Sequence, residues 1–209
     1  MKKFAMIVLL SFFLSGCATV SLRKAEYLAE NYNEVAGKSV AVVPVIDARS
    51  DKTEYDHGWL VNKGLLDKDI LALLKGKGFS PKTISVDPGQ CGSLEGTHVI
   101  SDIVCFDLSA FPDQDLFFLV SVDQYVAPES MHVVGATKVT GVMYSRKSGS
   151  IIWKDTIAGK YSNTYGSQGP GAYLGMLLTK AMSKGSILYN NVFSTVTELF
   201  NSLPSASKQ

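Results

Sequence analysis

The sequence predicts a mixed α/β (α+β) fold in which helices pack against a mixed sheet of about five strands, within a single domain. Three observations support this class. An apolar, β-branched run is followed by a helical pattern and a second apolar run, a two-residue hydrophobic period dominates the middle of the chain, and helical patterns close it. The chain has 209 residues, 46% of them hydrophobic and 19% charged, which is enough to bury one sizeable core.

The first half of the chain alternates between helical and strand patterns. Residues 19–36 carry apolar residues among charged ones and predict a short helical tether. The continuous apolar run at 39–46 predicts a buried strand, and Pro44 either places it near a sheet edge or marks its end. Apolar residues at helical spacing predict a helix over 59–75, and a second strand is expected over 79–86.

The second half predicts a meander of strands followed by two helices. A hydrophobic period of two residues predicts strands over 115–127, 132–145 and 151–157. The last two strands are joined by a turn at 146–149, in which Gly149 can take the positive φ that a tight hairpin requires. A glycine-rich loop at 166–171 then leads to helices expected over 172–183 and 187–203.

The first seventeen residues have the order of a bacterial lipoprotein signal. Lys2 and Lys3 precede a mostly apolar run at 4–13, which is too short to span a bilayer. The segment Leu14-Ser15-Gly16-Cys17 resembles a lipobox, in which Leu14, Ser15 and Gly16 form the signal-peptidase recognition site and Cys17 is the lipidated residue. The small side chains at 15 and 16 let a peptidase reach the backbone, and the thiol of Cys17 can form a thioether with diacylglycerol.

This signal divides the chain into three predicted parts. They are a signal peptide at 1–16, a lipidated N-terminus with a short helical tether at 17–37, and one globular periplasmic domain at 38–209. Burial of acyl chains contributes ~0.8 kcal/mol per CH₂, so a diacylglycerol plus an N-acyl chain anchors a protein stably. Resemblance to Gram-negative lipoproteins implies outer-membrane sorting, since Ala18 rather than Asp follows the cysteine. A helix over residues 18–38 would span ~30 Å.

The charge balance argues against nucleic acid as a partner. The whole chain has 20 basic and 19 acidic residues, and loss of Lys2 and Lys3 with the signal peptide leaves a net charge of −1. Proteins that bind nucleic acid carry a basic excess, which is missing from this sequence. We therefore expect the lipid, rather than electrostatic attraction, to hold the protein at the membrane.

Two cysteines remain beside the lipidated one, Cys91 and Cys105. In the oxidising periplasm they could form a disulfide, which would stabilise the fold by about 3 kcal/mol in the chain-entropy model. The alternative is two free thiols, with Cys105 as a small core residue beside Val104 and Phe106. A zinc site is disfavoured, because the sequence has no Cys-x-x-Cys pair and His98 is the only imidazole nearby.

Two segments resemble a group of Gram-negative envelope lipoproteins that includes the curli-export lipoprotein and the penicillin-binding-protein activator lipoproteins. Residues 40–50, Val-Ala-Val-Val-Pro-Val-Ile-Asp-Ala-Arg-Ser, are similar to the group's first strand and its polar exit loop. Residues 141–153 look like its hairpin, which turns through Ser-Gly and ends in an aromatic residue, here Trp153. The resemblance implies a sheet with helices packed on it, a non-enzymatic assembly or scaffold role, and no catalytic residue.

No catalytic or cofactor site emerges from the motifs. One polar loop gathers five candidate metal ligands, but their order does not match a calcium loop: Asp47, Asp51, Glu54, Asp56 and His57. The sequence has no Gly-x-Ser-x-Gly elbow for a hydrolase, and the histidines are scattered. The run at 166–171 lacks the Gly-Lys-Ser/Thr ending of a phosphate loop. We therefore predict no catalytic residue, no metal and no cofactor beyond the covalent lipid.

The function that follows is that of a lipid-anchored outer-membrane protein facing the periplasm. Its domain would bind protein partners in an envelope assembly, export or biogenesis complex, and it could form a homo-oligomer. Two alternatives stay open. One is a lipid-anchored envelope hydrolase, and the other is a ring-forming secretion-pore lipoprotein.

Overall fold

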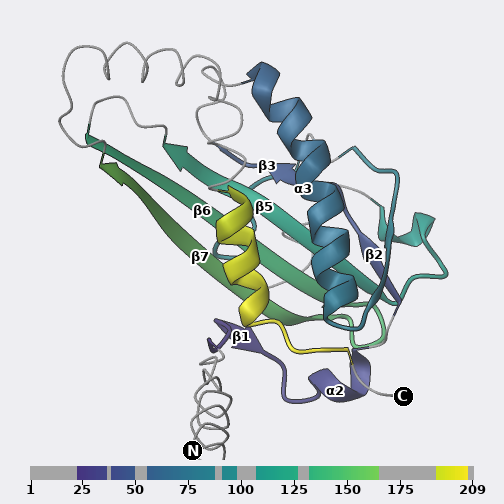
Figure 1. Ribbon diagram of the computed structural model, residues 1–209. Coiled ribbons are helices and arrows are strands. Elements are labelled where there is room, and N and C mark those ends of the chain that lie inside the picture. Colours follow the sequence, from purple (N-terminus) through teal and green to yellow (C-terminus); the bar gives the residue numbers. More distant parts are fainter. Residues whose placement is uncertain are drawn as a thin grey trace, which may run out of the picture.

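A seven-stranded mixed sheet forms the centre of the computed structural model (Figure 1). The structure describes residues 23–36, 39–49, 56–87, 91–97, 107–126, 132–164 and 192–206. The strands are β1 Tyr27–Leu28, β2 Ser39–Val42, β3 Ile46–Asp47, β4 Ser80–Thr83, β5 Leu116–Val126, β6 His132–Ser145 and β7 Ser150–Thr164. Their order is β1-β7-β6-β5-β2-β4, with β3 paired to β5. The predicted α+β class is confirmed, and the sheet exceeds the expected five strands because the short strand β1 was not predicted and one predicted strand forms two, β2 and β3.

Parallel and antiparallel pairs divide the sheet into two halves. The strands β5, β6 and β7 form the predicted antiparallel meander, and β1 adds to its outer side. On the other side, β2 and β4 run parallel to one another and β2 runs parallel to β5. The connection from β2 to β4 passes through the helix α3 (Asp56–Gly76), which a parallel pair requires.

Two helices cover the same face of the sheet. Helix α3 confirms the helix predicted over 59–75, and a helical segment at 192–201 confirms part of the one predicted over 187–203. Figure 1 shows both in front of the sheet, α3 toward β2 and the helical segment, in yellow, toward β6 and β7. Their buried residues join one face of the sheet in the first core cluster, to which α3 contributes Leu66, Ile70 and Leu74 and the helical segment contributes Val192, Val196, Leu199 and Phe200.

The opposite face of the sheet carries a second core cluster, against which loop residues and Leu108 of the 3-10 helix η3 (Leu108–Ala110) pack. Alternation along β5 sends Leu116, Phe118, Val120 and Val122 to the first cluster and Phe117 and Leu119 to the second. Loop residues Ile84, Cys91 and Leu94 cover the second cluster. Both faces of β5 are therefore buried over its first half, which explains its nearly continuous apolar sequence.

The hairpin between β6 and β7 turns where the sequence predicted. Gly149 has a φ of +66°, the left-handed value that this turn needs and that glycine adopts without strain. The register between β6 and β7 shifts near this turn, because Met143 pairs with Trp153 while the next residue, Tyr144, pairs with Ile151. Ile152 is thus the extra residue of a β-bulge, and its carbonyl accepts a 2.9 Å hydrogen bond from the N–H of Ala29.

The N-terminal region differs from the prediction of one helical tether. Between residues 23 and 36 only α2 (Tyr32–Val35) is helical, and β1 pairs antiparallel with β7 through Tyr27 and Leu28. Tyr32 and Ala36 belong to the first core cluster, and the Tyr32 hydroxyl donates to the carbonyl of Pro204 at 3.3 Å. Residues 27–36 therefore pack into the fold ahead of residue 38, where the globular domain was predicted to begin.

The predicted strand over 39–46 is divided by Pro44 into β2 and β3. Proline lacks the N–H that a sheet ladder needs, so the ladder stops before it. The following N–H, that of Val45, leaves the sheet pattern and donates to Oδ1 of Asp67 on α3 at 2.8 Å. A helix side chain therefore replaces a missing strand partner at the break.

Asp67 predicts a measurable pH dependence of stability. Burial raises its pKa above the ordinary value, an effect larger than the lowering by the Val45 N–H and by Lys63. The folded state therefore binds the carboxyl proton of Asp67 more tightly than the unfolded state does. The stability that this proton contributes is fully present below the unfolded pKa and is lost as pH rises through the raised folded pKa. Asp67→Asn keeps the acceptor without the buried charge. We expect the free energy of unfolding of Asp67→Asn, measured with urea at pH 4.5 and pH 7, to lack the decrease with pH that Asp67 causes in the wild-type protein.

The matched control for this prediction is Asp67→Ala. This variant removes the acceptor and leaves the Val45 N–H without its partner, which should lower the free energy of unfolding by ~1–3 kcal/mol at both pH values. If Asp67→Asn and Asp67→Ala lowered the free energy of unfolding equally, the role of the Asp67 oxygen as acceptor for the Val45 N–H would be contradicted.

Candidate functional site

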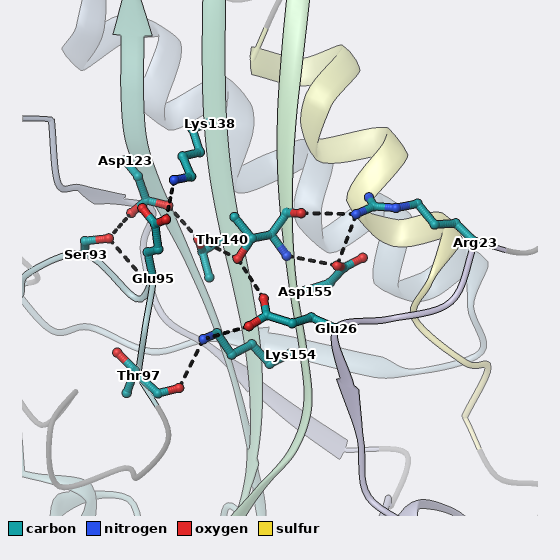
Figure 2. A network of polar contacts seen from close by, with 11 residues as sticks. Arg23, Glu26, Ser93, Glu95, Thr97, Asp123, Lys138, Thr140, Lys154 and Asp155 are labelled. Atoms are coloured by element: carbon teal, nitrogen blue, oxygen red, sulfur yellow. Dashed lines mark hydrogen bonds and ion pairs between the residues drawn. The ribbon is translucent and has the colours of Figure 1, made fainter.

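A strip of polar side chains lies on the face of the sheet opposite the helices, next to the second core cluster. We call it the polar strip, and its members are Ser121 and Asp123 on β5, Lys138 and Thr140 on β6, and Lys154 and Thr156 on β7. The same two-residue alternation that sends Phe117 and Leu119 to this face continues into Ser121 and Asp123. Figure 2 shows the strip between the loop that carries Ser93, Glu95 and Thr97 and the N-terminal segment that carries Arg23 and Glu26.

Asp123 is the centre of the hydroxyl contacts in this strip. One carboxylate oxygen accepts from Ser93 and from Ser121, each at 2.6 Å, and the other accepts from Thr140 at 2.6 Å. The Ser121 hydroxyl in turn accepts from the N–H of Leu94 at 3.2 Å. Both oxygens of Asp123 are thus occupied by donors of the protein, and the contacts hold the loop 91–97 against the sheet.

The two lysines of the strip are each paired with a glutamate. Lys138 forms an ion pair with Glu95, and both side chains are partly exposed. The Lys154 side chain is only 3% exposed, and its ammonium donates to the carbonyl of Thr97 at 3.2 Å. Its ion pair with Glu26 has an N–O distance of 3.4 Å. A buried ammonium requires such partners, because burial of an unpaired charge is costly.

Asp155 lies next to Lys154 in the sequence but points to the helix-covered face. Its side chain is 1% exposed, and Ser202 donates to one carboxylate oxygen at 2.5 Å. The other oxygen accepts from the backbone N–H of Thr156 at 2.9 Å and lies 3.4 Å from the Arg23 guanidinium. The same guanidinium donates to the carbonyl of Thr156 at 3.1 Å.

The N-terminal segment therefore contacts β7 from both sides. Arg23 reaches Asp155 on the helix-covered face, while Glu26 reaches Lys154 and the Thr156 hydroxyl on the opposite face (Figure 2). We call Arg23 and Glu26 the N-terminal clamp. Together with the β1 pairing, the clamp fixes the start of the described chain to the sheet at residues 153–156 of β7.

The strip and the clamp connect the loop 91–97 and the N-terminal segment to the sheet. The lysines, Asp123 and Asp155 all have partners within the network, so their donors and acceptors are engaged in holding three segments together. Among the described residues, no group of three or more His, Cys, Asp and Glu side chains is placed to hold a metal ion. No helix within the described ranges is both long and apolar enough to cross a membrane.

The residues singled out in the sequence are only partly described by the structure. Cys91 is 7% exposed in the second core cluster, whereas Leu14, Ser15, Gly16, Cys17 and Cys105 lie outside the described residues. Asp47 binds Arg49 through both carboxylate oxygens, at 2.7 and 2.8 Å. This pairing leaves Asp47 engaged in a salt bridge, and Asp51 and Glu54 also lie outside the described residues.

Sequence reasoning missed both the polar strip and the clamp. Lys138 and Thr140 interrupt the apolar alternation of β6, and this interruption was the available signal. Their partners come from loops and from a segment more than a hundred residues away, which no local pattern connects to them.

Comparisons with known proteins identify no family for this chain. No family model matches the sequence, and the search of curated proteins finds no match. Solved structures with partial similarity include a PelC dodecamer from Paraburkholderia phytofirmans, with a TM-score of 0.44, 11% identity and coverage of 88% of this chain and 96% of that chain. Lipoprotein GNA1162 from Neisseria meningitidis has a TM-score of 0.42 and 15% identity, with 70% and 96% coverage.

A third similar structure is a minor lipoprotein from Acinetobacter baumannii, with a TM-score of 0.28, 11% identity and coverage of 82% of this chain and 97% of that chain. Two of these three proteins are thus named lipoproteins. TM-scores and identities this low carry no argument about the function of this chain. The resemblance to curli-export and penicillin-binding-protein activator lipoproteins stays a prediction.

Proposed function

We propose that this chain is a lipid-anchored lipoprotein of the outer membrane that faces the periplasm. Its domain binds protein partners in an envelope assembly, export or biogenesis complex and has no catalytic role. The observation that carries the proposal is the position of the N-terminal clamp relative to the lipobox. Arg23, which is bound to β7, follows Cys17 by only six residues.

This spacing revises the expected reach of the tether. If the whole segment 18–38 were helical, in line with the helical tether predicted over 19–36, it would separate the domain from the lipid by ~30 Å. Because Arg23 is already part of the fold, six residues at 3.3–3.6 Å each allow at most ~22 Å, even when fully extended. Partners of the domain are therefore expected at the membrane surface that carries the anchor.

A binding role, rather than hydrolysis, is supported by the use of the charged groups in the network. Asp123 accepts three hydroxyl hydrogen bonds, which use its carboxylate to hold the loop 91–97 against the sheet. Lys154 and Asp155 are buried and engaged in fixing the N-terminal segment. The network thus supports attachment of the domain to its anchor.

We also propose the disulfide between Cys91 and Cys105. Cys91 lies in the second core cluster beside Leu94, in the loop that Asp123 and Ser121 fasten to the sheet. A bond from this position would tie the covering loop to the segment that precedes β5. In the periplasm such a bond would persist.

The anchor is tested by Cys17→Ser in cells. Because only the thiol can carry the diacylglyceryl group, we expect the variant to lose its acyl mass and either to leave the membrane fraction or to accumulate unprocessed. Ala18→Ser keeps the thiol and serves as the matched control, which should stay in the outer membrane. Membrane retention and normal processing of Cys17→Ser, judged by fractionation and mass spectrometry, would refute the lipoprotein proposal.

The binding role can be tested in cells that produce the protein with its native Cys17 and a photocrosslinking residue in place of Lys68. Lys68 is an exposed position on α3. We expect a discrete adduct with an outer-membrane or periplasmic protein that depends on the intact lipobox. Dominant capture of an inner-membrane protein would contradict the short tether and the proposed location.

A further inference from the structure

We propose that the β1 edge of the sheet rests on the lipid bilayer that holds the anchor, with Tyr27 and Leu28 in contact with its interfacial region. This inference rests on the proposed lipidation of Cys17 and adds the orientation of the domain and the residues that touch lipid. The partner is thus a phospholipid surface.

The first argument is the exposure of two large apolar side chains at this edge. Tyr27 is 48% exposed and Leu28 is 47% exposed, and among the described residues Leu65 is the remaining large hydrophobic with comparable exposure. Two of these three side chains are therefore neighbours in one two-residue strand. β1 is the outermost strand on its side of the sheet, so its side chains have no neighbouring strand beyond them within the described structure.

The second argument is the length of chain between this edge and the lipid. At most ~22 Å separates Cys17 from Arg23 when the segment is fully extended. The opposite edge of the sheet, β4, lies five strand spacings from β1, or about 24 Å at 4.7–4.9 Å per spacing. The tether is therefore no longer than the sheet is wide. It starts at the clamp beside β1, so β1 is the edge that it holds nearest to the bilayer.

The third argument is the chemistry of the two edges. Successive side chains of a strand point to opposite faces, so Tyr27 and Leu28 can both reach one surface only when the sheet approaches it edge-on. Tyrosine is favoured at membrane interfaces, because its ring is apolar and its hydroxyl remains hydrated, and leucine gains from burial among acyl chains. At the other edge, β4 contains Pro81 and exposed Lys82, which are typical of an edge that stays in water.

The test uses the complete lipidated protein, reconstituted into vesicles of phosphatidylethanolamine and phosphatidylglycerol. An environment-sensitive NBD fluorophore is attached to a cysteine introduced by Tyr27→Cys, and in a second protein by Leu65→Cys. Leu65 is the matched control, because it is an exposed leucine on α3, away from the β1 edge. The wild-type protein, treated identically, reports any labelling of Cys91 or Cys105. Flotation of the vesicles separately measures whether the protein is anchored.

We expect the label at position 27 to shift its emission to the blue on reconstitution and to be quenched by nitroxide-bearing lipids. The label at position 65 should keep its aqueous emission and be quenched by iodide instead. Flotation without lipid quenching at position 27 would overturn the inference and leave the anchor standing. Shielding of position 27 from both quenchers would show contact with a second copy and would also overturn it. Failure to float would refute the anchor, and the orientation with it.

Discussion

Replacement of Trp153 by alanine is expected to lower the free energy of unfolding by about 3–5 kcal/mol, the usual range when a large aromatic side chain is removed from a core. Trp153 is fully buried and belongs to the first core cluster. Its ring stacks on Phe118, with centroids 5.8 Å apart and planes at 20°, and lies over Gly141. Urea unfolding followed by circular dichroism measures the loss.

Two companion variants separate volume from polarity at this position. Trp153→Phe keeps an aromatic ring and removes an indole N–H that has no hydrogen-bond partner in the described structure, so it should cost clearly less than the alanine variant. Gly141→Ala should cost ~1–3 kcal/mol, because its Cβ would lie 2.7 Å from Cδ2 of Leu199 and 2.9 Å from Cη2 of Trp153.

The double variant Gly141→Ala/Trp153→Phe checks this packing directly. Phenylalanine lacks the outer indole atoms that the new methyl group would meet, so the two changes together should destabilise less than the sum of the single changes. Strict additivity would contradict the proposed contact between these positions.

Asp155→Ala is expected to cost about 3 kcal/mol, because it removes a buried carboxylate that joins three segments. Ser202 loses its acceptor on β7, the N–H of Thr156 loses a bond, and Arg23 loses its ion pair. We expect a lower urea midpoint, and also faster proteolysis within residues 23–28 under native conditions, since one side of the clamp is gone.

Arg23→Ala and Asp155→Asn are the controls for this result. Arg23 is partly exposed, so its removal should free the N-terminal segment for proteolysis with a smaller change in global stability. Asn at 155 retains an oxygen acceptor for Ser202 and should fall between wild type and alanine. An Asp155→Ala protein with wild-type stability and wild-type proteolysis would show that the contacts of Asp155 do not hold these segments together.

The sequence predicted those elements whose signals are local. Helix α3 has its buried residues at helical spacing, and the β6–β7 hairpin has a glycine at the position where the turn needs a positive φ. The helical prediction over 19–36 failed at residues 27–28, which form β1, because helical propensity is a weak preference. Tertiary partners decided the conformation there, since Tyr27 and Leu28 pair with a strand more than a hundred residues away.

The site was less predictable than the fold, because its members come from separate elements. The strip forms only when three strands pair in the correct register. The Lys154 ammonium meets its partners only when a loop and the N-terminal segment both reach the face of β7 that carries it. Pairs such as Lys154 with Glu26 have no spacing rule in the sequence. The lipobox, by contrast, is contiguous and needs no fold to be read.

The clamp on β7 has a mechanical consequence for a protein held by a lipid. Tension on the proposed anchor would enter the domain at residues 153–156, where β1 contributes a two-residue ladder and Arg23 and Glu26 contribute ionic contacts. Behind this point, β7 is paired with β6 along nearly its whole length. The attachment is therefore weaker than the hairpin to which it is fastened. Under such tension the contacts of the N-terminal segment would break first, and the β6–β7 hairpin would stay intact.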